Sequence, residues 1–158
     1  MSAHDYEFQS ISGTAISLAA YEGKPVLVVN TASRCGFTPQ YRDLQALWER
    51  YRARGLVVLG VPSNDFGAQE PGTEAEIASF CEVNYAVDFP MTAKQAVTGE
   101  EAHPFYKWVA VTLGEGGGPR WNFHKYLIGP AGELVSAYPS KVSPLDEGLV
   151  KEIETLLA

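Results

Sequence analysis

The sequence contains few of the residues from which metal sites and disulfide scaffolds are built. It has two cysteines, Cys35 and Cys81, and three histidines in 158 residues. The cysteines lie far apart in the chain and the histidines are scattered, so no cluster has the spacing of metal ligands. We therefore expect no metal ion, no other cofactor and no structural disulfide.

Basic residues and long apolar runs are also scarce. The chain carries 12 lysines and arginines against 19 aspartates and glutamates, a net charge of −7, which argues against nucleic-acid or anionic-membrane binding. Its apolar runs are far shorter than the roughly 20 residues of a membrane-spanning helix, and residues 1–8 lack a signal-peptide pattern. We expect a cytoplasmic protein in which residues 1–158 form a single domain.

The sequence does contain a cysteine between a buried strand and a helix. Residues 26–29 are an apolar, mostly β-branched run, which predicts a strand over residues 25–30 that is buried on both faces. A helix is expected from about residue 39 to 54, with Gly55 as its C-cap. Cys35 lies between them, where free N–H groups at the helix N-terminus and the cation of Arg34 favour the nucleophilic thiolate. The alternative is that Cys35 is a small buried apolar residue.

A second strand and a polar loop follow this helix. Residues 56–62 are again apolar, and strand, helix and strand with this spacing predict a βαβ unit with parallel strands. Residues 63–72 hold too many turn formers to be anything but a loop. Because the carboxyl ends of parallel strands meet at one edge of a sheet, this loop and the Cys35 turn should converge there.

The remaining elements follow from capping and periodicity signals. Thr73 and Glu76 form a capping box that starts a helix ending near residue 85, with Cys81 on its apolar face. Further along the chain we expect a short strand at 89–91, a helix at 101–111, a flexible loop at 114–118, a hairpin of strands 125–128 and 134–138, and a helix from about residue 143. The first two dozen residues predict a further short hairpin.

This order of elements is that of a thioredoxin-like fold, an α/β fold with a central mixed sheet flanked by helices. Four ordered blocks also resemble the glutathione peroxidase family, specifically its cysteine-containing, thioredoxin-dependent members. The blocks are residues 29–38 (VNTASRCGFT), residues 64–72 (NDFGAQEPG), Phe80-Cys81 with Phe89-Pro90, and Trp121-Asn122-Phe123. The resemblance runs from about residue 6 to the C-terminus.

The resemblance implies a peroxidase whose substrate is a hydroperoxide. Cys35 would attack the O–O bond and become a sulfenic acid. Gln69, Trp121 and Asn122 would be neutral hydrogen-bond donors to the sulfur and the leaving oxygen, without a histidine base. Each has an ordinary alternative, a core aromatic for Trp121 and local backbone bonding for the two amides.

The resemblance also implies that Cys81 is the resolving cysteine. Thr38 stands where thioredoxins carry their second cysteine, which disfavours simple dithiol exchange. Cys81 would condense with the sulfenic acid of Cys35, and thioredoxin would reduce the disulfide. A disulfide needs Cα atoms within about 7 Å, so a Cys81 on a buried helix face would have to be freed by local unwinding. The alternative is a packed core thiol.

Several positions depart from the family pattern. Asp65 stands where the family usually has glutamine, Ser63 where a third cysteine is frequent, residues 93–99 diverge, and residues 138–141 lack the usual arginine. The chain also lacks the additional loop by which larger members form tetramers and narrow their sites. We therefore expect a monomer with an open site that admits bulky hydroperoxides.

The prediction is a thiol peroxidase that reduces hydrogen peroxide and organic or lipid hydroperoxides, with thioredoxin as its reductant. One alternative uses glutathione directly and leaves Cys81 structural. Another is a peroxide sensor or redox relay, which would oxidise a partner once rather than turn over with a reductant. The last is a redox-inert binding module, in which Cys35 would react as an ordinary thiol.

Overall fold

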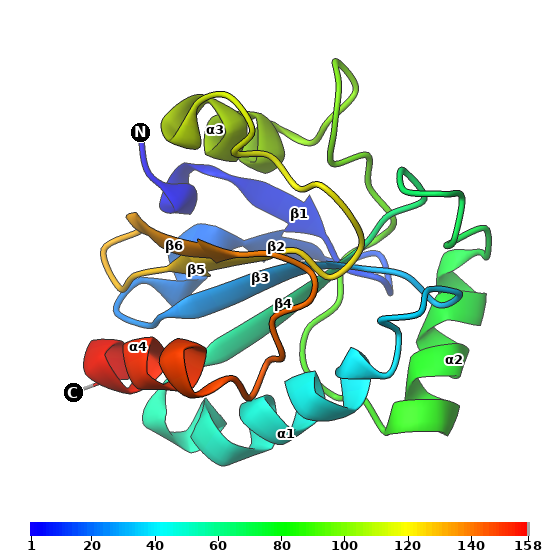
Figure 1. Ribbon diagram of the computed structural model, residues 1–158, viewed down its shortest axis with the longest axis horizontal. Helices are drawn as coiled ribbons and strands as arrows, with labels where there is room; N and C mark the ends of the chain where they lie inside the picture. Colours follow the sequence, from blue (N-terminus) through cyan, green and yellow to red (C-terminus); the bar gives the residue numbers. More distant parts are fainter. Residues whose placement is uncertain (158) are drawn as a thin grey trace.

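The centre of the structure is a four-stranded mixed sheet with the strand order β4-β3-β5-β6 (Figure 1). β3 (Val26–Thr31) and β4 (Val57–Pro62) are parallel, as predicted, and α1 (Gln40–Tyr51) connects them. β5 (Lys125–Ile128) lies antiparallel to β3 and pairs on its other side with β6 (Leu134–Tyr138), the second arm of the predicted hairpin. The mixed sheet is therefore confirmed.

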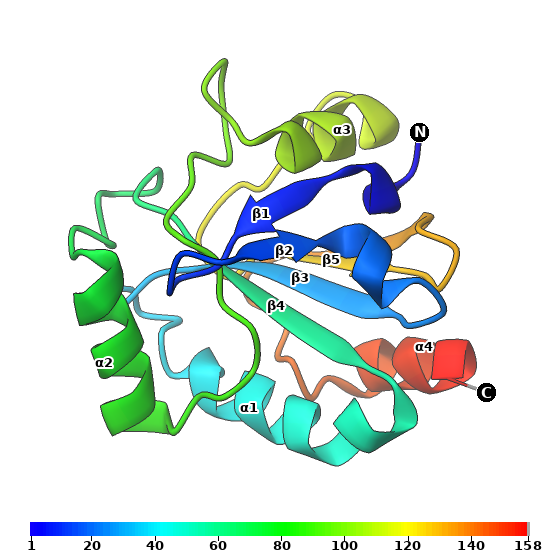
Figure 2. The same ribbon diagram turned by 180° about the vertical axis from the view of Figure 1, so that it is seen from behind.

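Helices cover both faces of this sheet and stand beyond one end of it. In the computed structural model, which describes residues 1–157, α1 and α4 (Glu147–Leu157) pack on one face and α3 (Pro104–Leu113) lies over the other (Figures 1 and 2). α2 (Glu74–Tyr85) stands beyond the carboxyl ends of β3 and β4. The predicted N-terminal hairpin, β1 (Glu7–Gln9) with β2 (Ala15–Ser17), lies on the α3 side.

The central strand β3 is buried because both of its faces are covered. Leu27 and Val29 join the apolar cluster formed with α1, α2 and α4, whereas Val26 and Val28 join the cluster formed with α3 and the N-terminal segment. Alternate residues of a strand point to opposite faces, so the doubly covered stretch from Val26 to Val29 has apolar residues at each position. This is why the strand could be recognised as an uninterrupted apolar run.

The predicted end of the first helix is confirmed by the backbone. Three short 3₁₀ helices accompany the regular elements: η1 (Ala3–Asp5), η2 (Leu18–Tyr21) and η3 (Arg52–Arg54). The last of these continues α1 by one turn, and Gly55 follows it with a φ of 114°. Glycine adopts this left-handed conformation without the steric cost that a Cβ imposes, which makes it the natural stop signal here.

Two helices begin three or four residues later than predicted. α3 begins at Pro104 rather than at residue 101, because the ring of His103 caps it by accepting the N–H of Phe105 at 3.0 Å. Proline suits the first helical position and disfavours helix in the residue before it. α4 begins at Glu147 rather than near residue 143, after a turn in which Asp146 Oδ2 accepts the next free N–H groups.

The strand predicted at 89–91 is also wrong. Met91 and Thr92 form only isolated bridges, one to Gly60 of β4 and one to Ser10. Pro90 has no N–H to donate to a ladder, so pairing cannot extend toward residue 89.

The capping box of α2 is present as predicted and provides a test of local stability. Thr73 Oγ1 accepts the N–H of Glu76 at 3.2 Å, and Glu76 Oε1 accepts the N–H of Thr73 at 2.9 Å. We expect Thr73→Ala to lower the free energy of unfolding by about 1 kcal/mol, measured by urea denaturation, because the cap is lost. Ser79→Ala, on an exposed position of the same helix, should cost less. An equal loss from both variants would contradict a capping role.

Candidate active site

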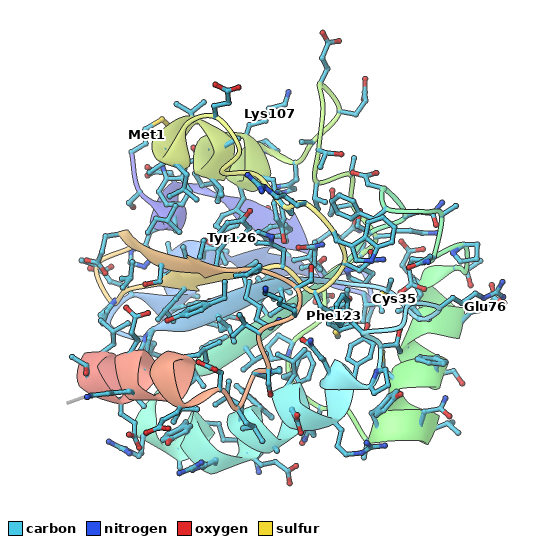
Figure 3. All side chains as sticks on the ribbon, viewed as in Figure 1. Met1, Cys35, Glu76, Lys107, Phe123 and Tyr126 are labelled. Atoms are coloured by element: carbon cyan, nitrogen blue, oxygen red, sulfur yellow. The ribbon has the colours of Figure 1, made fainter. Side chains whose placement is uncertain are left out.

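Three segments meet at one edge of the sheet. The Cys35 turn follows β3, the loop of residues 63–72 follows β4, and Trp121-Asn122-Phe123 lie one residue before β5. Because β5 is antiparallel to β3, its amino end lies at the carboxyl end of β3. Figure 3 shows Cys35 and Phe123 toward this edge, with α2 beyond them. The convergence predicted for the two loops is confirmed.

Hydrogen bonds join these segments to one another. Arg34, next to the cysteine, donates its backbone N–H to the carbonyl of Gln69 at 3.0 Å. Asn30, near the end of β3, accepts the N–H of Phe123 on its backbone carbonyl at 2.6 Å. Its side-chain Nδ2 donates to the carbonyl of Trp121 at 2.9 Å. The relative placement of the three segments is therefore fixed mainly by backbone groups.

Cys35 is half-buried and lies in a tight turn. The N–H of Phe37 donates to Sγ at 3.3 Å, while the N–H of Cys35 itself donates to Thr38 Oγ1 at 2.9 Å. As predicted, Cys35 lies in the turn between β3 and α1, and α1 begins at Gln40, within one residue of the expected start. The helix dipole acts within the first turn, so the amide of Phe37 is the closer source of positive potential at the sulfur. The partial exposure of Cys35 also differs from that of a fully buried apolar residue.

Gln69, Trp121 and Asn122 come together beside this turn. Asn122 is buried, and its Nδ2 donates to Gln69 Oε1 at 2.9 Å, which leaves the Nε2 of Gln69 as the free donor of that amide. Gly67 has a φ of 67°, and a Cβ there would lie 3.0 Å from the Trp121 ring and 3.4 Å from Gln69 Nε2. The two side chains thus converge over Gly67. Trp121 is 37% exposed and packs on Phe66, so it is not a core aromatic.

The predicted donors do not bond to the sulfur directly. Within residues 1–157, the hydrogen bond that Sγ accepts comes from Phe37, whereas Asn122 donates to Gln69. The arrangement can therefore offer N–H groups to a molecule that approaches the thiol, rather than to the thiol itself.

Cys81 lies on α2 and is only 2% exposed. It belongs to the apolar cluster against which Cys35 packs, and both cysteines are free. Burial raises the pKa of the Cys81 thiol to about 11, and the charge of Glu70 acts in the same direction. At neutral pH, Cys81 in the folded helix is therefore a protonated thiol.

Three buried polar residues near the site were not singled out from the sequence. Asn30 follows the apolar run of β3, Lys125 begins the otherwise apolar strand β5, and Glu70 accepts the hydroxyl of Ser33 at 3.0 Å. Burial raises the pKa of Glu70 and lowers that of Lys125 to about 7. For Asn30 and Lys125 the available signal was an amide or a charge at the end of an apolar run, since burying such a group has a desolvation cost; Glu70, in a loop, had no comparable signal.

One departure from the family pattern has a clear structural role. The carboxylate of Asp65 accepts the N–H of Val97 at 2.7 Å, and both the N–H and the hydroxyl of Thr98 at 3.0 and 3.1 Å. Asp65, which replaces the glutamine usual at this position, therefore connects the divergent segment of residues 93–99 to the loop that carries Gln69.

Residues 1–157 hold no group of three or more His, Cys, Asp or Glu side chains that could bind a metal ion. In the same part of the chain, no helix has the length and apolar character needed to cross a membrane.

A partly exposed cysteine at the first strand-to-helix turn of such a sheet is typical of thiol redox proteins. The family model of the glutathione peroxidases matches residues 3–110, and the chain belongs to the glutathione peroxidase family. It is a peroxidase, as predicted. Glutathione peroxidase homolog BsaA of Halalkalibacterium halodurans is 45% identical over 161 residues, covering 99% of this chain and 100% of that protein. Hydroperoxy fatty acid reductase gpx1 of Synechocystis sp. is 43% identical, covering 98% of this chain and 95% of its own.

Solved structures agree with the fold. The crystal structure of Trgpx in its apo form aligns with a TM-score of 0.80 at 34% identity, covering 99% of this chain and 95% of that one. A thiol:disulfide interchange protein of the thioredoxin family from Chlorobium tepidum aligns with a TM-score of 0.73 at 15% identity. The alignment covers 97% of this chain and 93% of that one. The predicted thioredoxin-like fold is confirmed.

The burial of Cys81 predicts unequal labelling of the two thiols. A pKa of about 11 leaves roughly one thiol in a thousand ionised at pH 8, against about a quarter for an unperturbed cysteine. Iodoacetamide should therefore add once to the native protein, on Cys35, and reach Cys81 at least about a hundredfold more slowly. Both sites should react in urea. Equal native rates at Cys35 and Cys81, measured by peptide mass spectrometry, would contradict this assignment.

Proposed function

We propose that the chain reduces hydrogen peroxide and organic hydroperoxides, including those of lipids, through Cys35. The thiolate attacks one peroxide oxygen, the O–O bond breaks, and the other oxygen takes up a proton and leaves as water or an alcohol. Cys35 becomes a sulfenic acid. The observation that carries the proposal is the partly exposed Cys35 at the sheet edge where Gln69, Trp121 and Asn122 converge.

In this proposal the three side chains stabilise the departing oxygen. Asn122 holds the amide of Gln69 in one orientation, so that the Nε2 of Gln69 remains free to donate. The indole N–H of Trp121 supplies a second donor. Both are neutral, so no buried charge has to be desolvated before negative charge develops on the oxygen.

We further propose that Cys81 resolves the sulfenic acid. Its thiol condenses with Cys35, water leaves, and thioredoxin reduces the resulting disulfide by exchange. Cys81 is buried on α2, so this step requires the helix to unwind locally. A helix of 12 residues at the rim of the molecule is a suitable element for such opening.

Direct reduction by glutathione is the second candidate, and the burial of Cys81 favours it. A thiol that is 2% exposed, with its pKa raised to about 11, is a poor nucleophile until α2 moves. An external thiol would then meet the half-exposed Cys35 first. A sensor role uses the same oxidation of Cys35 and is distinguished by its lack of turnover with either reductant.

The surface around the site is suited to bulky substrates. Phe66 and the exposed Trp121 present an apolar rim to a bulky hydroperoxide, and a relative is named hydroperoxy fatty acid reductase. We propose that the chain works as one domain and as a monomer, in the cytoplasm, where its two thiols would be kept reduced.

The donor role is tested on the oxidation step alone. We expect Gln69→Ala and Trp121→Phe to lower the second-order rate constant for oxidation of the reduced protein by hydrogen peroxide, by about a hundredfold, because one donor is lost. Trp108→Phe, a tryptophan of α3 on the other side of the sheet, is the matched control and should keep the wild-type rate. Full rates in both donor variants would exclude the donor mechanism.

The roles of the two cysteines are tested by mass spectrometry after one equivalent of hydrogen peroxide. Wild-type protein should lose two hydrogens and yield a Cys35–Cys81 peptide link. Cys81→Ser should instead gain one oxygen on Cys35, and Cys35→Ser should show neither product. An oxygen on Cys35 of the wild type, with Cys81 free, would favour glutathione over thioredoxin.

A further inference from the structure

Lys125 is a charged residue inside the core that the mechanism above does not use. It is the first residue of β5, is 0% exposed, and is followed by the apolar side chains of Tyr126, Leu127 and Ile128. In the described part of the chain no carboxylate pairs with it. Its Nζ donates to two backbone carbonyls instead, that of Phe123 at 2.7 Å and that of Ser140 at 3.2 Å.

The first of these carbonyls belongs to a strained turn at the site. Phe123 has a φ of 66°, a left-handed conformation that residues with a Cβ rarely adopt. Such a conformation persists only where the surroundings hold it. The N–H of Phe123 is held by Asn30, and its carbonyl is held by Lys125. This turn determines where Asn122 and Trp121 point.

The second carbonyl connects this turn to the cysteine turn. Ser140 is buried, and its carbonyl also accepts Nε2 of Gln40 at 2.7 Å. Gln40 is the first residue of α1, and its N–H donates to the carbonyl of Phe37 at 2.8 Å. Phe37 is the residue whose N–H contacts the sulfur of Cys35. A short series of hydrogen bonds therefore runs from the donor turn, through Lys125 and Ser140, to the turn of the thiol.

We propose that Lys125 is a positioning residue for peroxide reduction, which fixes the Trp121-Asn122-Phe123 turn relative to Cys35. This rests on the proposed function, since it matters only if the donors of that turn act on the peroxide. A methionine would fill the same space without the desolvation cost of an amine. The amine is needed because it can serve two carbonyls at once.

The protonation state of Lys125 does not alter this role. Burial lowers the pKa of Lys125 to about 7, so the ammonium and the neutral amine coexist near neutrality. The neutral form still carries two N–H groups, one for each carbonyl. The positioning effect should therefore be the same on either side of pH 7.

The test compares Lys125→Met with Ile128→Ala, a core lesion at the opposite end of the same strand. Two quantities are measured on each folded variant: the second-order rate constant for oxidation by hydrogen peroxide, and the ¹⁵N–¹H resonances of the three tryptophan indoles. We expect Lys125→Met to lower the rate constant by about ten- to a hundredfold, because the donors are misplaced. The Trp121 resonance should shift while those of Trp48 and Trp108 stay. Ile128→Ala should lose stability but keep its rate and its Trp121 resonance.

Several outcomes would overturn the inference. A folded Lys125→Met with the wild-type rate and an unshifted Trp121 resonance would do so, and so would an equal rate loss in Ile128→Ala. If Lys125→Met does not fold, Lys125→Gln is used, which retains an N–H pair on a shorter side chain. It should show a smaller rate loss with the same Trp121 shift, and wild-type behaviour would reject the proposal.

The failure of this inference is distinguishable from the failure of the proposed function. If Gln69→Ala and Trp121→Phe keep full rate, the donor mechanism is wrong, and a shift of Trp121 in Lys125→Met has no catalytic meaning. If those two variants are slow and Lys125→Met is not, only the positioning role is wrong.

Discussion

The site depends on one interaction, the antiparallel pairing of β5 with β3. This pairing brings the start of one strand to the end of the other, although the two lie about ninety residues apart in the chain. Asn30 extends the pairing past the last ladder residue by holding Phe123 with its backbone and Trp121 with its side chain. Because the sheet is doubly covered and rigid, the cysteine turn and the donor turn inherit their relative geometry from it, as a preorganised site requires.

The fold was predictable where its signals are local. The strands around Val28 and Val58 are uninterrupted apolar runs, and the capping box of Thr73 and the hairpin turn are read from a few adjacent residues. The starts of α3 and α4 were missed because they depend on which side chain accepts the first free N–H groups. A histidine ring does so at α3 and an aspartate at α4, and neither choice is evident from apolar spacing.

The residues of the candidate site could be chosen from the sequence, but the contacts between them could not. The family blocks identified Cys35, Gln69, Trp121 and Asn122, and the structure gathers them at one edge. The bond from Asn122 to Gln69 joins residues 53 positions apart, and a choice of partner over such a distance is decided by tertiary packing. The same holds for Lys125. Its long side chain starts on β5 and reaches the carbonyl of Ser140, which follows the next strand, β6.

The contact of Asp65 with Val97 and Thr98 has a consequence for exchanging parts between relatives. One carboxylate oxygen accepts three N–H and O–H groups of a segment that is divergent in this chain. Consider a chimaera that receives only residues 93–99 from a relative with glutamine at position 65. It would place the Asp65 carboxylate against a segment that does not present the same N–H and O–H groups to it. The loop of residues 63–72 and the segment of residues 93–99 should therefore be exchanged together. A crossover between them would break the hydrogen bonds that join them.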